Sequence, residues 1–533
     1  RRKLYEKVPL LDCFTAPCKG GCPIHQDIPE YIELCRKGAY ASALRLITEK
    51  NPLPFITGTI CAHNCMTKCM RNYYDEPVNI RATKLVAAEK GYDAHMSKIT
   101  PPAPVTDGRK VAVIGGGPTG MSAAYFVGRA GIPVTLFEKA DRLGGIVRQV
   151  IPAFRISDEA IDKDVALMEK MGVEVKLNTE APSVAELKAQ GYTHIFFAVG
   201  AWKAGRLDIP GNVVPVIGWL RDMKAGKDVS LGHVAVVGGG NTAMDAARAA
   251  LKAGAMSSTL VYRRTKKYMP ADAEELEMAI ADGVEFLELV APVEQKDGKL
   301  ICEKMKLGDP DDKGRRKPVP TGEMVEIPCD TVVSAVGEKV ESEIFTKNGI
   351  TVDAKGIPDF KTNLEGVYAG GDAMRGPATV VEGIADAQYF ANAVIGEAYK
   401  FAIPAKAVAT REEAVAKKGI LCESAKCEGD RCLTCNVVCQ VCADVCPNRA
   451  NVVIELPDGR QQILHVDRMC NECGNCAVFC PYDSAPYRDK FTLFLTKEGF
   501  DESVNNQGFL PLGGNKVLVR LNGKVFEADL DGK

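Results

Sequence analysis

The sequence of 533 residues contains no apolar run long enough to cross a membrane. Its most apolar stretch, residues 195–202, has the length of a buried strand. Charge of one sign is not in excess either, because 67 Lys and Arg stand against 69 Asp and Glu, a net charge of -2. We therefore expect no membrane span and no nucleic acid as a partner.

Histidine is scarce, with six in the chain, and none lies in a recognisable metal-ligand motif. No arrangement of His, Cys and Asp indicates an acid–base or nucleophilic site, so we predict no catalytic side chain and assign the chemistry to bound groups. An apolar leader is also missing, and we expect a cytoplasmic protein. The chain starts at Arg1 without a Met, which indicates a processed chain or part of a longer polypeptide.

Cysteine is abundant, with 20 residues that fall into two blocks. Seven lie in residues 13–69 and eleven in residues 422–480, with only Cys302 and Cys329 between the blocks. A chain of this length needs no disulfide scaffold, and dense cysteines in a cytoplasmic protein are metal ligands first. We expect Cys302 and Cys329, which are isolated in predicted strands, to be buried small apolar residues.

A first glycine-rich turn follows the predicted strand 111–114 and precedes an Ala-rich helix. Gly115 permits a tight turn, Gly117 lets a pyrophosphate approach the backbone, and Gly120 allows close helix packing. Glu138 ends the next predicted strand, where its carboxylate can accept hydrogen bonds from ribose hydroxyls. Strand, turn, helix and terminal acid together predict a dinucleotide site.

A second turn of the same kind follows the predicted strand that begins at Val234, and here the next strand ends in two arginines instead of an acid. The guanidinium groups suit a 2′-phosphate, which favours NADPH over NADH. A solvated basic turn is the alternative, because Lys266 and Lys267 continue the charge. The candidate cofactor-binding residues are Gly238, Gly240, Asn241, Thr242, Arg263 and Arg264.

The C-terminal cysteine block contains the run C-x2-C-x2-C-x3-C-P, which is typical of bacterial ferredoxins with two 4Fe–4S clusters. A partner run from Cys432 to Cys446 has one extra residue after Cys435. Cys432 therefore competes with Cys435 as a ligand, and we expect Cys422 and Cys427 not to be ligands. One predicted set is Cys435, Cys439, Cys442 and Cys480; the other is Cys446, Cys470, Cys473 and Cys476.

In residues 1 to about 95, helical patterns at 28–37 and 40–48 alternate with a third group of cysteines. The spacing of these cysteines is C-x4-C-x3-C-P and then C-x3-C-x3-C. The candidate ligands are Cys13, Cys18, Cys22, Cys61, Cys65 and Cys69.

Several short stretches resemble the small subunit of glutamate synthase and the FAD and NADPH domains of dihydropyrimidine dehydrogenase. They are Gly144-Gly145, residues 151–155, 198–200, 262–264 and 269–270, and the run 367–372. The resemblance implies FAD on the first turn and NADPH on the second. It also implies that Gly145, Arg155 and Gly371 bind cofactor, that Asp372 contacts the FAD ribityl chain, and that residues 376–381, with Thr379 and Val380, lie near the isoalloxazine ring.

The same resemblance extends to the N-terminal cysteines and implies two sets. Cys13, Cys18 and Cys69 form one set, and Cys22, Cys61 and Cys65 form the other. The additional cysteine of that family falls at Leu10 here, so the first set needs Cys35 or another group. The second set also has no obvious fourth ligand, and we expect one or two N-terminal clusters.

No cysteine occurs between Cys69 and Cys302, so the redox-active pair that disulfide reductases keep beside the flavin is absent from the sequence. Electrons must leave by the cysteine blocks. Together with residues 447–451 and 486–491, the whole arrangement resembles the C-terminal half of the YgfK-type flavoproteins, to which selenate reduction has been assigned by name.

We therefore expect a multidomain α/β protein in which an NAD(P)H domain is nested in an FAD domain. The expected parts are a helical iron–sulfur domain (1–100), an FAD domain in two pieces (101–222 and 330–410), the NAD(P)H domain (223–329), a ferredoxin-like domain with two 4Fe–4S clusters (411–490) and a β-rich tail (491–533).

The predicted function is electron transfer from NAD(P)H through FAD and clusters to a terminal reductase domain or subunit, within a larger chain or hetero-complex. Selenate and a nitrogen heterocycle are the candidate acceptors by resemblance. The alternatives are a subunit of glutamate-synthase type and a non-catalytic iron–sulfur sensor or scaffold.

Overall fold

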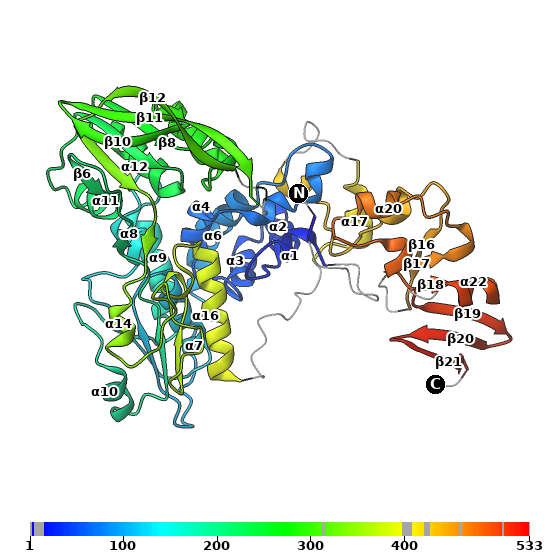
Figure 1. Ribbon diagram of the computed structural model, residues 1–533. Coiled ribbons are helices and arrows are strands. Elements are labelled where there is room, and N and C mark those ends of the chain that lie inside the picture. The colour runs from blue at the N-terminus through cyan, green and yellow to red at the C-terminus, as the bar shows by residue number, and fades with distance from the viewer. Residues whose placement is uncertain are drawn as a thin grey trace. The chain divides into compact units, whose positions relative to one another are not determined.

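The computed structural model describes residues 3–4, 15–311, 314, 316–396, 408–419, 427–457, 461–503 and 506–531. The chain forms two compact units (Figure 1). An α/β unit contains residues 51–62 and 98–401, and a cysteine-rich unit contains residues 1–50, 63–97 and 402–533. Residues 51–62, which the sequence analysis placed in the helical N-terminal domain (1–100), thus belong to the α/β unit.

The first sheet of the α/β unit is parallel, with five strands in the order β15-β4-β1-β2-β3. Helix α7 and helix α16 pack together, and Figure 1 shows them side by side. Phe196 and Phe390 stack with ring centres 4.4 Å apart in this core. The strands are β1 (Val111–Ile114), β2 (Val134–Phe137), β3 (Glu174–Lys176), β4 (His194–Phe197) and β15 (Val367–Ala369), and the helices are α7 (Pro118–Arg129) and α16 (Val380–Ile395).

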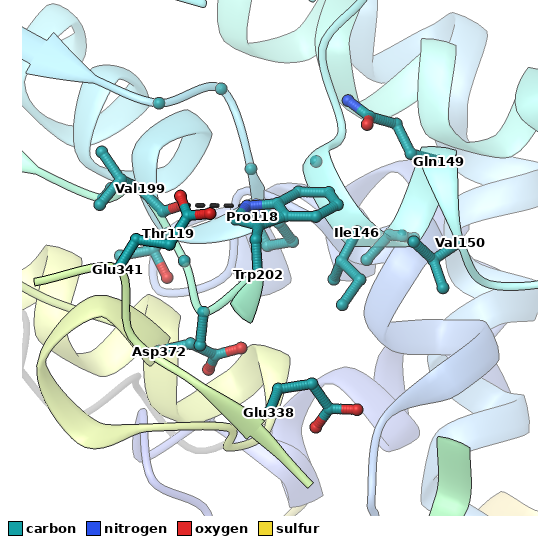
Figure 2. Close-up of a pocket in the computed structure, with 18 of the residues that line it drawn as sticks. Pro118, Thr119, Ile146, Gln149, Val150, Val199, Trp202, Glu338, Glu341 and Asp372 are labelled. Carbon is teal, nitrogen blue, oxygen red and sulfur yellow. Dashed lines mark hydrogen bonds between the residues drawn. The ribbon is translucent and has the colours of Figure 1, made fainter. Parts of the chain in front are cut away.

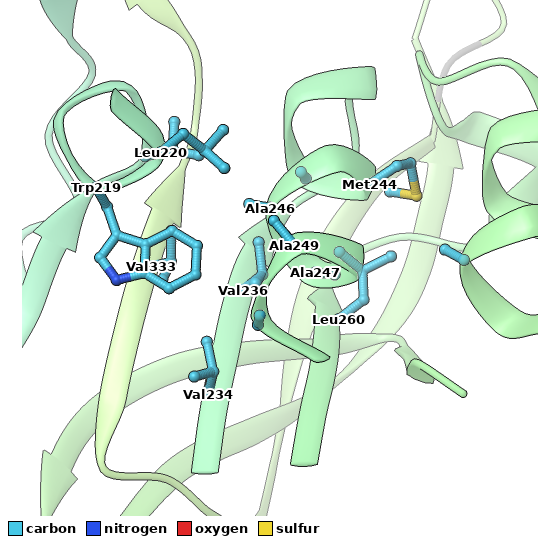
Figure 3. Packing of buried hydrophobic residues seen from close by; sticks show 14 of the residues in the cluster. Trp219, Leu220, Val234, Val236, Met244, Ala246, Ala247, Ala249, Leu260 and Val333 are labelled. Carbon is cyan, nitrogen blue, oxygen red and sulfur yellow. The ribbon is translucent and has the colours of Figure 1, made fainter. Parts of the chain in front are cut away.

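The second sheet is also parallel, with five strands in the order β6-β13-β7-β8-β9. Trp219 packs against it together with Met244 and the alanines of α12 (Figure 3). The strands are β6 (Val213–Pro215), β7 (His233–Gly238), β8 (Ser257–Tyr262), β9 (Glu285–Glu288) and β13 (Thr331–Ala335), and the helices are α11 (Val216–Lys224), α12 (Asn241–Lys252) and α13 (Ala273–Ala281).

The bounds of this second sheet differ from the predicted 223–329. Strand β6 comes before residue 223 and β13 after residue 329, yet β13 pairs with both β6 and β7. The sequence pattern missed this because both strands are short and their partners lie far away in the chain.

A three-stranded antiparallel sheet and short connections complete the α/β unit. The N-terminal end of α4 is capped by the buried Asp164, which accepts from Phe55 N at 3.1 Å and Ile56 N at 2.8 Å. The elements are α4 (Pro54–Ile60), α8 (Gly145–Gln149), α9 (Asp158–Glu169), α10 (Val184–Ala189), β5 (Lys203–Ala204), η2 (Lys266–Tyr268), β10 (Val290–Lys296), β11 (Lys299–Pro310), β12 (Arg316–Pro328), β14 (Glu338–Lys339), α14 (Glu343–Thr346) and α15 (Asp372–Arg375).

The N-terminal part of the cysteine-rich unit is helical, as predicted. Helices α3 and α6 pack closely because Gly91 has no side chain, and a methyl group there would lie 2.8 Å from the Tyr40 carbonyl carbon. The elements are α1 (Pro17–Gly20), α2 (Ile28–Arg36), α3 (Tyr40–Thr48), α5 (Asn64–Thr67), η1 (Met70–Tyr73) and α6 (Ile80–Met96).

The C-terminal part of this unit is built on a six-stranded sheet in the order β16-β17-β18-β19-β20-β21. The tail predicted at 491–533 therefore continues the sheet of the cysteine block, because β18 pairs with β17. The elements are α17 (Arg411–Ala416), α18 (Glu428–Arg431), α19 (Val441–Asp444), β16 (Asn451–Glu455), β17 (Gln461–Val466), η4 (Asp467–Met469), α20 (Asn475–Phe479), α21 (Pro486–Asp489), β18 (Thr492–Leu493), α22 (Lys497–Glu502), β19 (Gly508–Gly513), β20 (Lys516–Leu521) and β21 (Lys524–Asp529).

In the part of the chain that the structure describes, no helix combines the length and the apolar character needed to cross a membrane.

Candidate functional site

The first glycine-rich turn lies between β1 and α7. Gly115 has φ +103°, and a methyl group there would lie 2.9 Å from the Ala198 carbonyl carbon, so the position requires glycine. Glu138 holds the turn from the end of β2, because its carboxylate accepts from Gly116 N at 2.6 Å and Ala140 N at 2.8 Å. Each carboxylate oxygen keeps a second lone pair, with which Glu138 can accept from a ribose hydroxyl.

This turn forms one wall of a cavity of about 890 Å³ within the α/β unit (Figure 2). The size lies in the upper range of cofactor sites. Residues of the first glycine-rich turn line the cavity, and so do Asn241 and Thr242 at the start of α12, directly after the second turn. Among the predicted cofactor-binding residues these are Gly115, Gly117, Glu138, Gly145, Arg155, Asn241, Thr242, Asp372, Thr379 and Val380.

The other predicted residues do not line the cavity: Gly120, Gly371, Gly238, Gly240, Arg263 and Arg264. Gly120 lies beneath the turn, where a methyl group would overlap the Gly115 carbonyl, which agrees with its predicted packing role. Gly371 has φ +63° and donates its N–H to Asp386 at 2.9 Å, so it shapes the turn before α15.

Asp372 and Glu338 bring two half-buried carboxyl groups to one region of the cavity, where Figure 2 draws both below Trp202. Burial above all raises the pKa of Asp372 to about 7, against a hydrogen bond from Ala378 N at 3.1 Å and with a smaller contribution from the neighbouring acids Glu338 and Glu382. Burial also raises the pKa of Glu338. Sequence reasoning missed Glu338, for which no motif exists.

Arg155 lines the cavity, and its guanidinium group is also engaged in two ion pairs. It donates to Asp245 Oδ1 at 2.9 Å and forms a second ion pair with Glu275. Asp245 lies on α12 and also lines the cavity, and burial raises its pKa to about 6 although Arg155 opposes the shift. Arg155 thus ties the loop after α8 to the helices of the second sheet.

The second glycine-rich turn lies between β7 and α12. Gly238 is closely packed, since a methyl group there would lie 3.0 Å from the Ala335 carbonyl carbon, whereas Gly240 faces open space. Arg263 and Arg264 follow β8, the strand that pairs in parallel with β7. The two arginines therefore follow the carboxyl end of the strand beside the turn, outside the cavity itself.

Four thiols that the sequence assigns to one cluster lie together in the C-terminal part of the cysteine-rich unit. Cys446, Cys470, Cys473 and Cys476 line one small cavity. Ala450 N donates to the sulfur of Cys446 at 3.2 Å, and Glu472 N donates to that of Cys470 at 3.3 Å. Backbone donors to cysteine sulfur are a means by which proteins adjust cluster potentials.

The second predicted set, Cys435, Cys439, Cys442 and Cys480, is only partly brought together. Cys439 lies near enough to Cys435 to raise the pKa of its thiol, after the larger effect of burial. Tyr482 also lies among these sulfurs, since its pKa is raised by burial and by Cys439, Cys435, Cys18 and Cys480. Cys442 instead packs beside Cys476 and Ile463.

A third cavity joins the two cysteine blocks within the cysteine-rich unit. Cys18, Cys69, Cys432 and Cys435 line it. Burial raises the pKa of Cys18, and the thiols of Cys69, Cys432 and Cys435 contribute in that order. The sequence did not connect the N-terminal cysteines with the C-terminal run.

The remaining cysteines have varied places. Cys13 and Cys422 lie outside the described residues, as does Leu10. Cys22 is buried, Cys65 is half-buried, and Cys61 belongs to the α/β unit by its position at the end of α4. Cys35 does not line the cavity of Cys18, and burial alone raises its pKa to about 11.

Cys302 and Cys329 are fully buried in an apolar cluster, as expected, and Cys427 is exposed. No three His, Cys, Asp or Glu side chains within the described ranges are placed to hold a single metal ion.

Two parallel nucleotide-binding sheets around one cavity define a flavin- and pyridine-nucleotide-dependent class of oxidoreductase. Comparison with known proteins agrees: residues 109–387 match the pyridine nucleotide-disulphide oxidoreductase family, and residues 8–96 match dihydropyrimidine dehydrogenase domain II, 4Fe-4S cluster. The chain belongs to the pyridine nucleotide-disulphide oxidoreductase family.

Three relatives are similar over most of the chain. The YgfK protein of Escherichia coli (strain K12), which is named as an oxidoreductase, is 41% identical across 100% of this chain and 54% of its own length. The NADP(+)-dependent formate dehydrogenase subunit beta of Moorella thermoacetica is 36% identical across 70% of this chain and 58% of its own. The glutamate synthase (NADPH) small chain of Halomonas elongata is 32% identical across 70% and 86%.

These matches confirm the resemblance to YgfK-type proteins and to the glutamate synthase small subunit. The chain spans 54% of the length of the YgfK protein and 58% of that of the formate dehydrogenase subunit.

Proposed function

We propose that this chain accepts hydride from NADPH on FAD and delivers electrons singly through 4Fe–4S clusters to a terminal reductase domain or subunit. The observation that carries the proposal is one cavity lined both by Gly117 of the first glycine-rich turn and by Asn241, the first residue of the helix that follows the second turn. FAD, when bound, supplies the conversion of a two-electron donor into one-electron steps that clusters can accept.

The residues present fit FAD on the first turn. Gly117 has extended backbone, and its nearest neighbour to a methyl group would be Gly145 Cα at 3.8 Å, so the backbone stands open to the cavity. The N-terminal end of α7 follows directly and favours phosphate. Asp372, at the N-terminal end of α15, is the proposed partner of the ribityl hydroxyls, and Thr379 and Val380 would lie near the ring.

NADPH is the proposed donor because Arg263 and Arg264 follow the strand beside the second turn. Two of the relatives reported above carry NADP(+) or NADPH in their names, which supports the same choice. The proposed layout is an NADPH domain nested in an FAD domain, with two ferredoxin-type clusters and one or two N-terminal clusters.

The acceptor lies in a further domain or subunit under this proposal. Selenate and a nitrogen heterocycle are the acceptors that the resemblance suggests. A subunit of glutamate-synthase type is less favoured, because the C-terminal ferredoxin-like run has no role there.

Anaerobic addition of NADPH tests the proposal. We expect bleaching of the flavin band and turnover with ferricyanide or a viologen as acceptor. A flavin band that persists would refute the proposed oxidoreductase activity and favour the alternative, a non-catalytic iron–sulfur sensor or scaffold.

The choice of NADPH is tested with Arg263→Ala and Arg264→Ala, and with Lys267→Ala as the matched control. Loss of a phosphate contact is expected to raise the KM for NADPH by about tenfold, equivalent to about 1.4 kcal/mol, without changing the rate with NADH. Equal use of NADH and NADPH by the unchanged chain would contradict the assignment.

A further inference from the structure

The C-terminal cysteine run contains one cysteine more than a two-cluster ferredoxin uses. Five cysteines lie between residues 432 and 446, whereas the ferredoxin pattern needs four from such a run. Cys435, Cys439, Cys442 and Cys446 reproduce the pattern with one extra residue, which leaves Cys432 without a role.

Cys432 lies with N-terminal cysteines instead. It lines the same cavity as Cys18 of α1 and Cys69, which directly precedes η1. All three side chains are buried, with 8 to 9% of their surface exposed. The rest of the lining is mostly apolar and includes Ile28, Ile32 and Val78. Three buried thiols from three separate segments thus converge on one mostly apolar cavity.

The helix before Cys432 is fixed on the N-terminal segment by charge-assisted hydrogen bonds. Arg431 donates to Glu76 O at 2.6 Å and to Pro77 O at 3.4 Å, and it is paired with Asp75 at 3.4 Å. Arg431 is 5% exposed, so these contacts are shielded from solvent. The position of Cys432 is therefore set by the chain segment that follows Cys69.

Further contacts hold the same pair of segments together. Glu428 accepts from Asn79 N at 2.8 Å. Lys417 forms a buried ion pair with Glu33 of α2 at 2.7 Å. Gly429 lies so close to Arg36 that a methyl group would be 2.9 Å from its Cγ. Close packing and paired charges thus join these segments at several points.

We propose that Cys432 is a ligand of the iron–sulfur cluster held by Cys18 and Cys69. The inference rests on the N-terminal cluster of the proposed function and assigns its missing ligand. Each cysteine binds iron as a thiolate, so each thiol releases one proton to solvent as its iron–sulfur bond forms. Cys435 lines the same cavity as Cys432, and we keep it in the ferredoxin-type set with Cys439.

This assignment explains two irregularities of the sequence together. The N-terminal set lacks a cysteine where the resembled family has one, at Leu10, and the C-terminal run has one too many. If Cys432 of the C-terminal block is a ligand of the N-terminal cluster, it explains both the missing and the additional cysteine. The N-terminal and C-terminal parts of the unit then depend on one another for cluster binding.

The test uses the full chain with its clusters reconstituted anaerobically, and it needs no NADPH. Cys432→Ala is compared with Cys18→Ala, which removes a ligand of the same cluster, and with Cys470→Ala, which removes a ligand of a ferredoxin-type cluster. Cys427→Ala is the matched control, because Cys427 is exposed, lies close to Cys432 in sequence and does not line the cavity. The measurements are iron and acid-labile sulfide per FAD, and electron paramagnetic resonance of the dithionite-reduced protein.

We expect Cys432→Ala and Cys18→Ala to lose the same resonance and about four iron atoms per chain, the content of one 4Fe–4S cluster. Cys470→Ala should lose a different resonance, and Cys427→Ala should match the unchanged chain. An unchanged FAD content shows that the α/β unit remains folded. Cys435→Ala provides a second comparison, with a spectrum expected to follow that of Cys439→Ala.

The inference fails if Cys432→Ala keeps all its iron while Cys18→Ala loses a cluster, or if Cys432→Ala follows Cys439→Ala. If Cys18→Ala keeps all its iron, the N-terminal cluster of the proposed function is itself absent. The two failures are therefore distinguishable.

Discussion

Two glycines of the first glycine-rich motif have different expected roles. Gly120 allows the helix to pack closely, whereas Gly117 faces the bound cofactor. A methyl group at Gly120 would overlap the Gly115 carbonyl oxygen and stand 3.3 Å from Val113 Cγ1, and both obstacles belong to the strand–helix contact itself. A methyl group at Gly117 would meet nothing closer than Gly145 Cα at 3.8 Å, an ordinary contact. Gly117 lines the cavity and Gly120 does not.

We predict that Gly120→Ala destabilises the chain even without FAD. Because the obstacle is backbone, α7 must shift away from β1, and the cost should reach about 3 kcal/mol, the upper end of overpacking effects. For a unit of this size the melting temperature should fall on the order of 5 to 10 °C. Gly117 has φ -75° and extended ψ, which alanine adopts, so Gly117→Ala should change apo stability by less than about 1 kcal/mol.

FAD binding, unlike apo stability, should be weakened by the substitution at Gly117. The methyl of Gly117→Ala would stand between the backbone and the pyrophosphate, and we expect at least about tenfold weaker FAD binding, or about 1.4 kcal/mol. The assay is thermal unfolding of FAD-stripped protein, followed by fluorescence titration with FAD. The reasoning is refuted if FAD-stripped Gly120→Ala has the same melting temperature as the unchanged chain, or if both variants lose the same stability without FAD.

Three further predictions concern two half-buried side chains, Arg155 and Asp372, and the buried Cys302. Arg155→Ala should lower the free energy of unfolding by about 3 kcal/mol, since Asp245 and Glu275 lose their shared cation, and Arg155→Lys should retain part of it in urea denaturation. The raised pKa of Asp372, about 7, makes its stabilising effect complete below pH ~4 and lost as pH rises through ~7, so Asp372→Asn should remove a slope of up to about 1.4 kcal/mol per pH unit from apo unfolding between these values. Cys302→Ala, at a fully buried position, should leave iron per chain unchanged, and any loss of iron would contradict its structural role.

The sequence was sufficient where the determinant is local. The tight turn at Gly115 and the spacing from Cys470 to Cys476 are properties of a few consecutive residues, and so are the helices at 28–36 and 40–48. The family could be identified for the same reason, because its signatures are short runs of consecutive residues.

The rest depends on pairings between distant residues, for which one sequence carries no signal. Strand β6 joins the second sheet only because β13 lies beside it, about 120 residues later in the chain. Arg155 looks like a cofactor ligand in its motif, yet its partners Asp245 and Glu275 come from two later helices. The sequences of α12 and α13 give no sign that these acids pair with Arg155, because a carboxylate on a helix is usually solvated.

The proposed role of Cys432 has a consequence for electron transfer within the cysteine-rich unit. Two residues separate Cys432 from Cys435, so their Cα atoms can never be more than about 11 Å apart, whatever the surrounding segments do. Both thiols line one cavity. If Cys432 serves the N-terminal cluster and Cys435 the ferredoxin-type set, the two sets are joined through a short covalent segment. The route between them then persists through any motion that leaves both clusters bound, and loss of either ligand should slow reduction of the other set.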